Sequence, residues 1–166
     1  SALEHYYSKN CPDAVFRQLY AGYEEKMRRA GLIDFDDMMV LCLELFTERK
    51  DILSAWQRRY RYILIDEFQD INRLQYEIVR MLAKPEDNLF IVGDDDQSIY
   101  RFRGAKPEIM LGFERDYPGT GRILLDVNYR STEEIVAPAL RLIGENQKRF
   151  SKAIHTTGRH GKNVIT

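Results

Sequence analysis

Two short apolar runs, each ending in a cluster of acidic residues, constrain most strongly what this chain can fold into. The first, YILI at 62–65, is followed by DEFQD at 66–70, and the second, LFIV at 89–92, by GDDDQ at 93–97. A continuous apolar run of this length is typical of a strand buried on both faces of a parallel sheet covered by helices. In open α/β sheets, ligands bind beyond the carboxyl ends of the strands. The pattern therefore predicts an α/β fold with both acidic clusters at one site.

The composition indicates a globular protein but does not indicate which kind of ligand or partner it binds. The 166 residues are 44% hydrophobic and 11% aromatic, which is enough for a packed core in one or two domains. Because 25 Lys and Arg face 26 Asp and Glu, the net charge of −1 neither supports nor excludes nucleic acid as a ligand. Basic residues gather toward the C-terminal end, which fits either a solvated tail or a basic patch: Arg141, Lys148, Arg149, Lys152, Arg159 and Lys162.

Several classes of protein are disfavoured by the same sequence. Cys11 and Cys42 are too few for a disulfide framework, and no Cys/His cluster has zinc-ligand spacing. No apolar run approaches the roughly 20 residues needed to cross a bilayer, and the N-terminus lacks a signal pattern. We therefore expect no membrane association and a cytoplasmic location. The chain begins with Ser1 rather than Met, which fits an excised piece of a longer protein.

Helical periodicity and helix-end signals predict the elements around the two runs. Apolar residues from Asp13 recur at the spacing of an amphipathic helix that Gly31 would end. Asp34 is a predicted N-cap, and Asp36 and Asp37 fit the first turn as partners of the helix dipole better than as metal ligands. Further helices are expected at 51–60, 71–82, 107–117 and 131–146, with a third strand at 123–127 and a capping box between Ser131 and Glu134.

Adjacent Asp66 and Glu67 at the end of a buried strand suit metal-assisted chemistry on water. One carboxylate can bind Mg²⁺, an ion that prefers oxygen ligands and retains several waters, while its neighbour orients or activates a water. Acidic residues also cap the helices that follow strands, so the pair taken alone fits a structural role equally well.

The segment 97–105 joins a polar residue, Gln97, to alternating aromatic and arginine residues. Bases of single-stranded nucleic acid stack on aromatic rings for about 1–3 kcal/mol each, while arginines hold phosphates. The alternative is that Tyr100 and Phe102 belong to the core and that the arginines lie on the surface. Without further context the core interpretation is the stronger of the two.

Three segments together resemble one protein family. LIDEFQD at 64–70, VGDDDQSIYRFRGA at 92–105 and NYRST at 128–132 resemble, in order and spacing, helicase motifs II, III and IV of the UvrD/Rep/PcrA-type superfamily 1 DNA helicases. GLIDFDD at 31–37 is similar to a stretch upstream of motif II in that family. The resemblance covers roughly residues 15–150. It implies an ATP-dependent helicase that moves on single-stranded DNA and unwinds duplex, with 3′ to 5′ polarity.

The resemblance also implies roles for residues at matching positions. Asp66 would hold Mg²⁺ and Glu67 would act on the attacking water, which is Walker B chemistry. Gln97 would contact the γ-phosphate of ATP, and Tyr129 would lie against the adenine. Arg130 would reach from the second motor domain to stabilise charge in the transition state.

The DNA-contacting positions of motif III would be Tyr100, Phe102 and Arg103. Phe102 stands where close relatives commonly carry tryptophan, and stacking should survive this exchange because both side chains present an aromatic face. Single-stranded DNA, DNA junctions and the remainder of the helicase chain are the implied partners.

A glycine-rich phosphate-binding loop is absent from this sequence. GRHGKN at 158–163 has its glycines too close together and Asn163 where Ser or Thr is needed, and no strand is expected before it, so we interpret it as an ordinary loop. The resemblance then implies a partial RecA-like P-loop NTPase domain with a helical subdomain. Residues 1–60 would end inserted subdomain 1B, 61–126 would form the back half of domain 1A, and 127–166 would open domain 2A.

Three functions remain open at this level. The leading one is a fragment of an ATP-dependent DNA helicase that is inactive by itself because it lacks the phosphate-binding loop. The second is the helicase part of a recombination helicase–nuclease, whose motifs resemble the same family. The third is a module that binds nucleic acid or a protein partner without hydrolysis.

Overall fold

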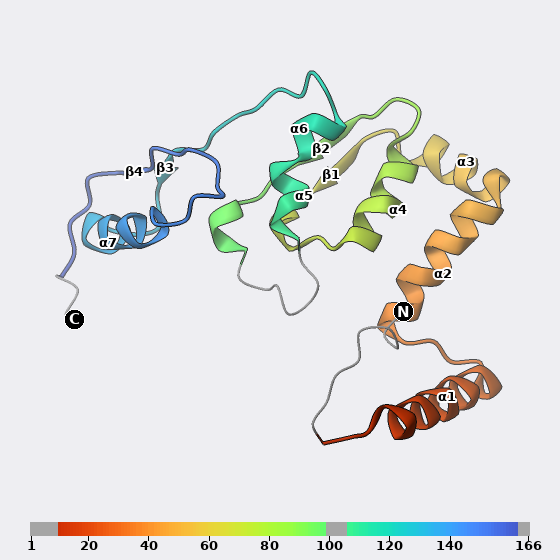
Figure 1. Cartoon of the computed structure of the whole chain (residues 1–166). Coiled ribbons are helices and arrows are strands. Elements are labelled where there is room, and N and C mark those ends of the chain that lie inside the picture. Colours follow the sequence, from red (N-terminus) through yellow and green to blue (C-terminus); the bar gives the residue numbers. More distant parts are fainter. Residues whose placement is uncertain (1–9, 99–105, 163–166) are drawn as a thin grey trace. The chain divides into compact units, whose positions relative to one another are not determined.

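The computed structural model describes residues 10–98 and 106–162, and Figure 1 shows how their helices and strands follow one another. The chain forms two compact units, Ser1–Lys50 and Asp51–Thr166, each described by itself below. The helices are α1 (Asp13–Ala30), α2 (Phe35–Glu48), α3 (Lys50–Arg59), α4 (Arg73–Ala83), α5 (Pro107–Leu111), α6 (Phe113–Asp116) and α7 (Glu133–Ile143). The strands are β1 (Ile63–Ile65), β2 (Leu89–Ile91), β3 (Val127–Asn128) and β4 (His155–Thr156), and two 3₁₀ turns are η2 (Phe68–Asp70) and η3 (Asp95–Gln97).

The first unit confirms the helix-end signals read from the sequence. Gly31 ends α1 in the left-handed region at φ 65°, where glycine carries no Cβ penalty. Asp34 caps α2 by accepting a hydrogen bond from the Asp37 N–H, and the Asp37 carboxylate in turn accepts one from the Asp34 N–H. The Tyr23 hydroxyl also donates to Asp34, at 2.8 Å. Backbone donation from Asp37 and the Tyr23 bond lower the pKa of Asp34, and the predicted capping role of Asp34 is confirmed.

A two-stranded parallel sheet organises the second unit. β1 pairs with β2 in the register Leu64↔Phe90, and α4 lies between them in the chain, which confirms the expected strand–helix–strand unit. Burial alternates along both strands: Leu64 is 72% and Phe90 54% exposed, while their neighbours in each strand are half-buried. The prediction that these strands are buried on both faces is therefore wrong for this chain. Helices cover one face only.

The covered face holds an aromatic core centred on Phe68. This ring is fully buried and makes edge-to-face contacts with Tyr76 of α4 (centroids 6.0 Å apart) and Phe113 of α6 (5.6 Å). Ile71 completes the buried cluster. Because Phe68 follows the acidic pair directly in sequence, its burial fixes where the end of β1 points.

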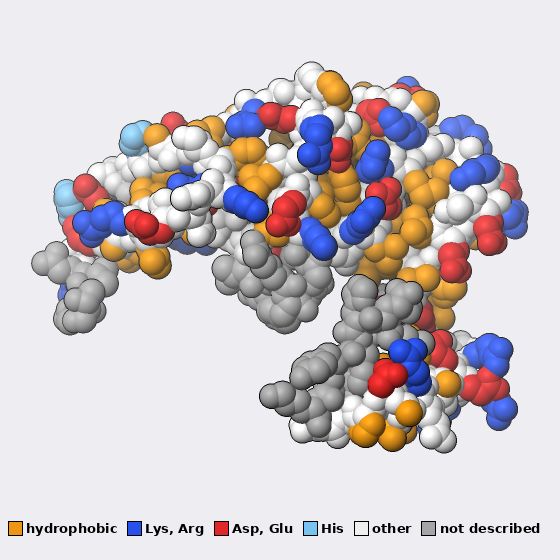
Figure 2. All heavy atoms as spheres, in the orientation of Figure 1, with side chains coloured by type: hydrophobic (Ala, Val, Ile, Leu, Met, Phe, Trp, Pro, Cys, Tyr) orange, Lys and Arg blue, Asp and Glu red, His pale blue; other side chains and the backbone are white. Residues whose placement is uncertain are grey.

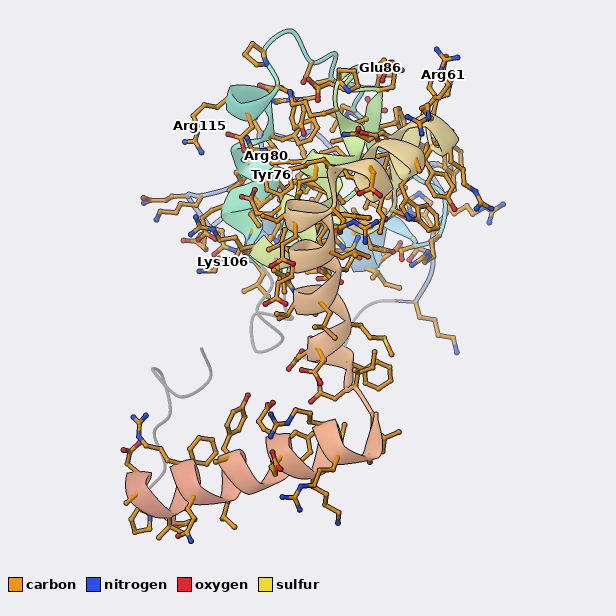
Figure 3. The ribbon with its side chains drawn as sticks, turned by 90° about the vertical axis from the view of Figure 1, so that its right-hand side faces the viewer. Arg61, Tyr76, Arg80, Glu86, Lys106 and Arg115 are labelled. Atoms are coloured by element: carbon orange, nitrogen blue, oxygen red, sulfur yellow. The ribbon has the colours of Figure 1, made fainter. Side chains whose placement is uncertain are left out.

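The edge of this core is polar on α4. The Tyr76 hydroxyl donates to Asp116 at 2.9 Å, and the Arg80 guanidinium lies 5.8 Å from the centre of the Tyr76 ring (Figure 3). Burial, followed by the hydrogen bond to Asp116, raises the pKa of Tyr76. The tyrosine therefore contacts Phe68 through its ring and joins α4 to α6 through its hydroxyl.

The C-terminal part departs from prediction at several points. The third strand expected at 123–127 is wrong for most of its length: 123–126 carry no strand, and β3 pairs in parallel with β4 in the register Asn128↔Thr156. Thr132, not Ser131, precedes α7, without a side-chain capping bond, and the helix ends at Ile143 rather than near 146. The loop at 157–162 has no regular structure, as expected, although the two-residue β4 does precede it.

Among the helices that are described, none combines the length and the apolar character needed to span a membrane.

The buried position of Phe68 predicts a large loss of stability on truncation. We expect Phe68→Ala to lower the free energy of unfolding by about 3–5 kcal/mol, because it removes a buried ring and leaves a cavity. Phe90→Ala is the matched control on the exposed face and should cost less than about 1 kcal/mol. Urea unfolding followed by circular dichroism measures both, and similar losses for the two variants would contradict this account of the core.

Candidate functional site

The two acidic clusters meet where the sheet ends. The parallel ladder continues beyond the strands, since the Val92 N–H donates to the Ile65 carbonyl at 2.8 Å and the Phe68 N–H donates to the Val92 carbonyl at 2.9 Å. A Cβ on Gly93 would lie 2.6 Å from Oε1 of Gln69 and 3.1 Å from the Phe68 nitrogen. Only glycine fits this approach, so the sequence permits the two loops to touch.

The acidic pair after β1 is exposed and locally strained. Glu67 has φ 51° and ψ 40°, a left-handed conformation that is uncommon for a residue with a Cβ. The Asp66 carboxylate accepts a hydrogen bond from the Glu67 N–H at 2.9 Å and stabilises this turn. Both side chains remain open to solvent, as groups that act on a ligand must be.

Gln69 connects the two acidic clusters. Its side chain is 2% exposed, and its amide nitrogen donates to Oε2 of Glu67 at 2.7 Å while its amide oxygen accepts the Asp94 N–H at 3.0 Å. Both ends of a buried amide are thus satisfied by the two loops. Gln69 lies inside the LIDEFQD segment but was not among the site residues predicted from the sequence.

Gln97 joins the same network from η3. Its amide nitrogen donates to Oδ2 of Asp94 at 2.8 Å, and its side chain is exposed. A continuous series of hydrogen bonds therefore runs from Glu67 through Gln69 and Asp94 to Gln97. The structure brings together Asp66, Glu67 and Gln97, which the sequence predicted as one site.

The three aspartates of the second cluster are paired with cations from far along the chain. Nζ of Lys152 lies 2.5 Å from Asp94, 2.5 Å from Asp95 and 3.0 Å from Asp96. Arg149 makes a two-pronged bond to Asp96, with Nε at 2.8 Å and Nη2 at 2.5 Å. The lysine therefore neutralises the three carboxylates, and among the described residues no group of three or more His, Cys, Asp or Glu side chains is arranged to hold a metal ion by itself.

These contacts shift the pKa values of both partners. Burial alone would raise the pKa of Asp94 and Asp96, but hydrogen bonds from Lys152, Gln97 and Arg149 lower both below their ordinary 3.8. Burial would lower the pKa of Lys152, but its bonds to the aspartates raise it above 10.5. The ionised carboxylates therefore contribute to folding stability above pH 3.8, and this contribution is lost as the pH falls through their pKa in the folded state. The protonated lysine contributes to folding stability below pH 10.5, and its contribution is lost as the pH rises through the pKa of Lys152 in the folded state.

Arg130 and Tyr129 lie on a separate turn after β3. The Asn128 side-chain oxygen accepts the N–H of Arg130 at 3.0 Å and of Ser131 at 2.9 Å, which shapes the turn. Tyr129 is 73% exposed and Arg130 is exposed too. Within residues 10–98 and 106–162, no hydrogen bond or ion pair joins either side chain to Asp66, Glu67 or Gln97. Tyr100, Phe102 and Arg103 lie outside the described residues.

Comparison with known proteins decides the family. Residues 1–118 match the UvrD/REP helicase N-terminal domain. The chain belongs to the UvrD/REP helicase family. Its relatives include YjcD of Bacillus subtilis, which is 53% identical over 140 residues (84% of this chain, 18% of the relative). The ATP-dependent DNA helicase PcrA of Bacillus subtilis is 43% identical over 149 residues (90% and 20%), and PcrA of Leuconostoc citreum 40% over 147 (89% and 20%).

The chain spans about a fifth of the length of these UvrD/REP relatives. The family membership confirms the resemblance drawn from the three segments, and the mixed α/β structure with small parallel sheets is compatible with it.

The residues present fit a magnesium ion of the kind this family implies. Asp66 offers an exposed carboxylate at the end of a strand, beside a second carboxylate that is held in place by Gln69. Mg²⁺ is commonly bound through one or two carboxylates together with phosphate oxygens and waters, so a single aspartate suffices.

Close approach at Gly93 predicts a specific cost for adding a methyl group. Gly93→Ala should lower the free energy of unfolding by about 1–3 kcal/mol, because the new Cβ meets Gln69 and backbone that cannot withdraw. Gly121→Ala is the matched control, since a Cβ there meets nothing within 4 Å. Thermal or urea unfolding distinguishes the two, and an unaffected Gly93→Ala variant would show that the loops do not touch as described.

Proposed function

We propose that this chain contains the Walker B and γ-phosphate-sensing part of an ATP-dependent DNA helicase. The observation that carries the proposal is the hydrogen-bonded series from Glu67 through Gln69 and Asp94 to Gln97. It is supported by the PcrA relatives, which are ATP-dependent DNA helicases. Hydrolysis needs a group that acts on water and a group that responds to the terminal phosphate, and this series couples one candidate for each.

The proposed division of labour follows from position. Asp66 would hold Mg²⁺, which when bound neutralises charge on the phosphate oxygens. One carboxylate oxygen of Glu67 accepts the hydrogen bond from Gln69, and the other oxygen would accept a proton from the attacking water. Gln97 is exposed at the end of the series and would donate to the γ-phosphate. Because Gln97 is also bonded to Asp94, a change in the position of the Gln97 side chain would be transmitted to the loop that contains Asp94.

The second part of the site would come from the turn after β3. Asn128 holds the backbone of this turn and leaves the Arg130 guanidinium exposed, so the arginine is able to reach a phosphate. A positively charged side chain there would stabilise charge on the transferring phosphoryl group. Tyr129, which is exposed as well, would cover the adenine.

DNA binding is proposed for the segment that follows Gln97. Tyr100 and Phe102 would stack on bases and Arg103 would contact phosphate, which links nucleotide state to a single-stranded DNA track. Figure 2 shows acidic and basic side chains interspersed on the visible face of the second unit. Affinity for DNA would therefore depend on the aromatic and arginine residues of this one segment rather than on a broad basic surface. Movement in the 3′ to 5′ direction, unwinding at junctions and a cytoplasmic location complete the proposal.

The domain organisation is part of the same proposal. Residues 1–60 would end subdomain 1B, 61–126 would form the back half of a RecA-like domain 1A, and 127–166 would begin domain 2A. The exposed face bearing Leu64 and Phe90 supports this division, because a parallel sheet in a RecA-like domain has helices on both faces. The remainder of the helicase would cover that face. The chain alone, which contains no phosphate-binding loop in its sequence, would not hydrolyse ATP.

The assignment of Glu67 predicts a clear kinetic result in the full-length protein. Glu67→Gln should lower kcat for DNA-stimulated ATP hydrolysis by about 10²–10⁴-fold, because the amide cannot accept the proton. ATP binding measured with a fluorescent analogue should persist.

Glu86→Gln, at an exposed position away from the two loops, is the matched control and should leave kcat unchanged. Turnover by Glu67→Gln at the wild-type rate would exclude Glu67 from the reaction.

A further inference from the structure

Four residues near the C-terminal end form a basic segment, Arg149–Lys152, that encloses the acidic loop Asp94–Asp96. Lys152 is 8% and Asp95 3% exposed at their side chains, so this is a largely buried ion cluster rather than a surface pair. The Phe150 N–H adds a bond to Oδ2 of Asp95 at 2.8 Å. Every aspartate of the loop therefore has at least one partner from the basic segment.

The basic segment also has its own anchorage. The Phe150 ring lies under the Arg122 guanidinium at 4.4 Å from the ring centre, and Arg122 in turn pairs with Glu114 of α6. Further along, β4 pairs Thr156 with Asn128 of β3. Asn128 shapes the turn that presents Arg130, so the strand that follows the basic segment pairs next to the turn of the proposed phosphate-contacting arginine.

The acidic loop in turn determines where Gln97 lies. Gln97 ends η3 directly after Asp96, and its side chain is bonded to Asp94, which Lys152 holds at 2.5 Å. Without the two cations, three carboxylates would face one another next to Gln97. Their repulsion in a half-buried place would favour separation of the loop and loss of the Asp94–Gln97 bond.

We propose that Arg149 and Lys152 are positioning residues for Gln97: they clamp the acidic loop so that the γ-phosphate-sensing amide is held relative to Glu67 and to the turn that carries Arg130. The inference rests on the function proposed above for Gln97. It assigns to the basic C-terminal stretch a role inside the protein rather than on nucleic acid.

The test is a double-mutant cycle on DNA-stimulated ATP hydrolysis in the full-length protein. Lys152→Met should lower kcat by about tenfold or more while KM for ATP changes by less than about threefold, because binding is affected less than the position of the amide. Gln97→Ala should lower kcat to a similar degree. The kcat of the double variant should lie within about twofold of the kcat of the slower single variant, since both changes remove the same positioned Gln97 amide.

Two controls separate positioning from general stability. Lys148→Met removes an exposed lysine four residues away and should leave kcat unchanged. Lys152→Arg retains the charge and should recover most of the lost turnover. If Lys152→Met fails to fold, Arg149→Gln replaces it in the cycle, because it removes the pair on Asp96 and leaves Lys152 in place.

Three results would overturn the inference. Lys152→Met and Arg149→Gln could both keep kcat within about twofold of wild type while Gln97→Ala loses it, which would leave the proposed function intact. The losses of the lysine and glutamine variants could multiply, which would show independent effects. Full activity of Gln97→Ala would instead remove the proposed role of Gln97, and the inference with it.

Discussion

The buried side-chain amide of Gln69 is the interaction on which the candidate site depends. Among the described residues it is the one polar residue that is buried as a whole, side chain and backbone together, and each end of its amide is bonded to a different acidic loop. A buried amide left without partners is costly, so the two loops are held by the need to satisfy it. The exposed carboxylate of Glu67 and the exposed amide of Gln97 take their positions from this hidden contact.

The aromatic core supplies the rigidity that the amide needs. Phe68 lies between Glu67 and Gln69 in sequence and is fully buried between Tyr76 and Phe113. Its backbone N–H is bonded to Val92, which ties the same residue to the second strand. Burial of the ring therefore provides the free energy that keeps Glu67 in a left-handed conformation, a strain typical of residues at functional sites.

The sequence predicted best those features that arise from local signals. The N-cap at Asp34 and the helix end at Gly31 follow from spacing of a few residues, and the meeting of the two acidic strand ends follows from the parallel pairing of the two apolar runs. Predictions from the sequence failed for features that depend on contacts with residues distant in the chain. Leu64 and Phe90 were predicted to be buried because a continuous apolar run does not reveal which face has a neighbour. Residues 123–126 formed no strand because, within the described part of the chain, no strand forms a ladder with them. The pairing of Lys152 with three aspartates joins residues more than fifty positions apart, and no local pattern indicates it.

The central claim is that the hydrogen-bonded series from Glu67 to Gln97 couples the hydrolytic group to the terminal phosphate. The most direct measurement is a crystal structure of the full-length protein with Mg²⁺ and a non-hydrolysable ATP analogue. The account predicts Asp66 at the metal, the Gln97 amide within hydrogen-bonding distance of the γ-phosphate, and Gln69 still bonded to Glu67 and to the Asp94 backbone. A γ-phosphate bound without Gln97, or Gln69 detached from either loop, would contradict it.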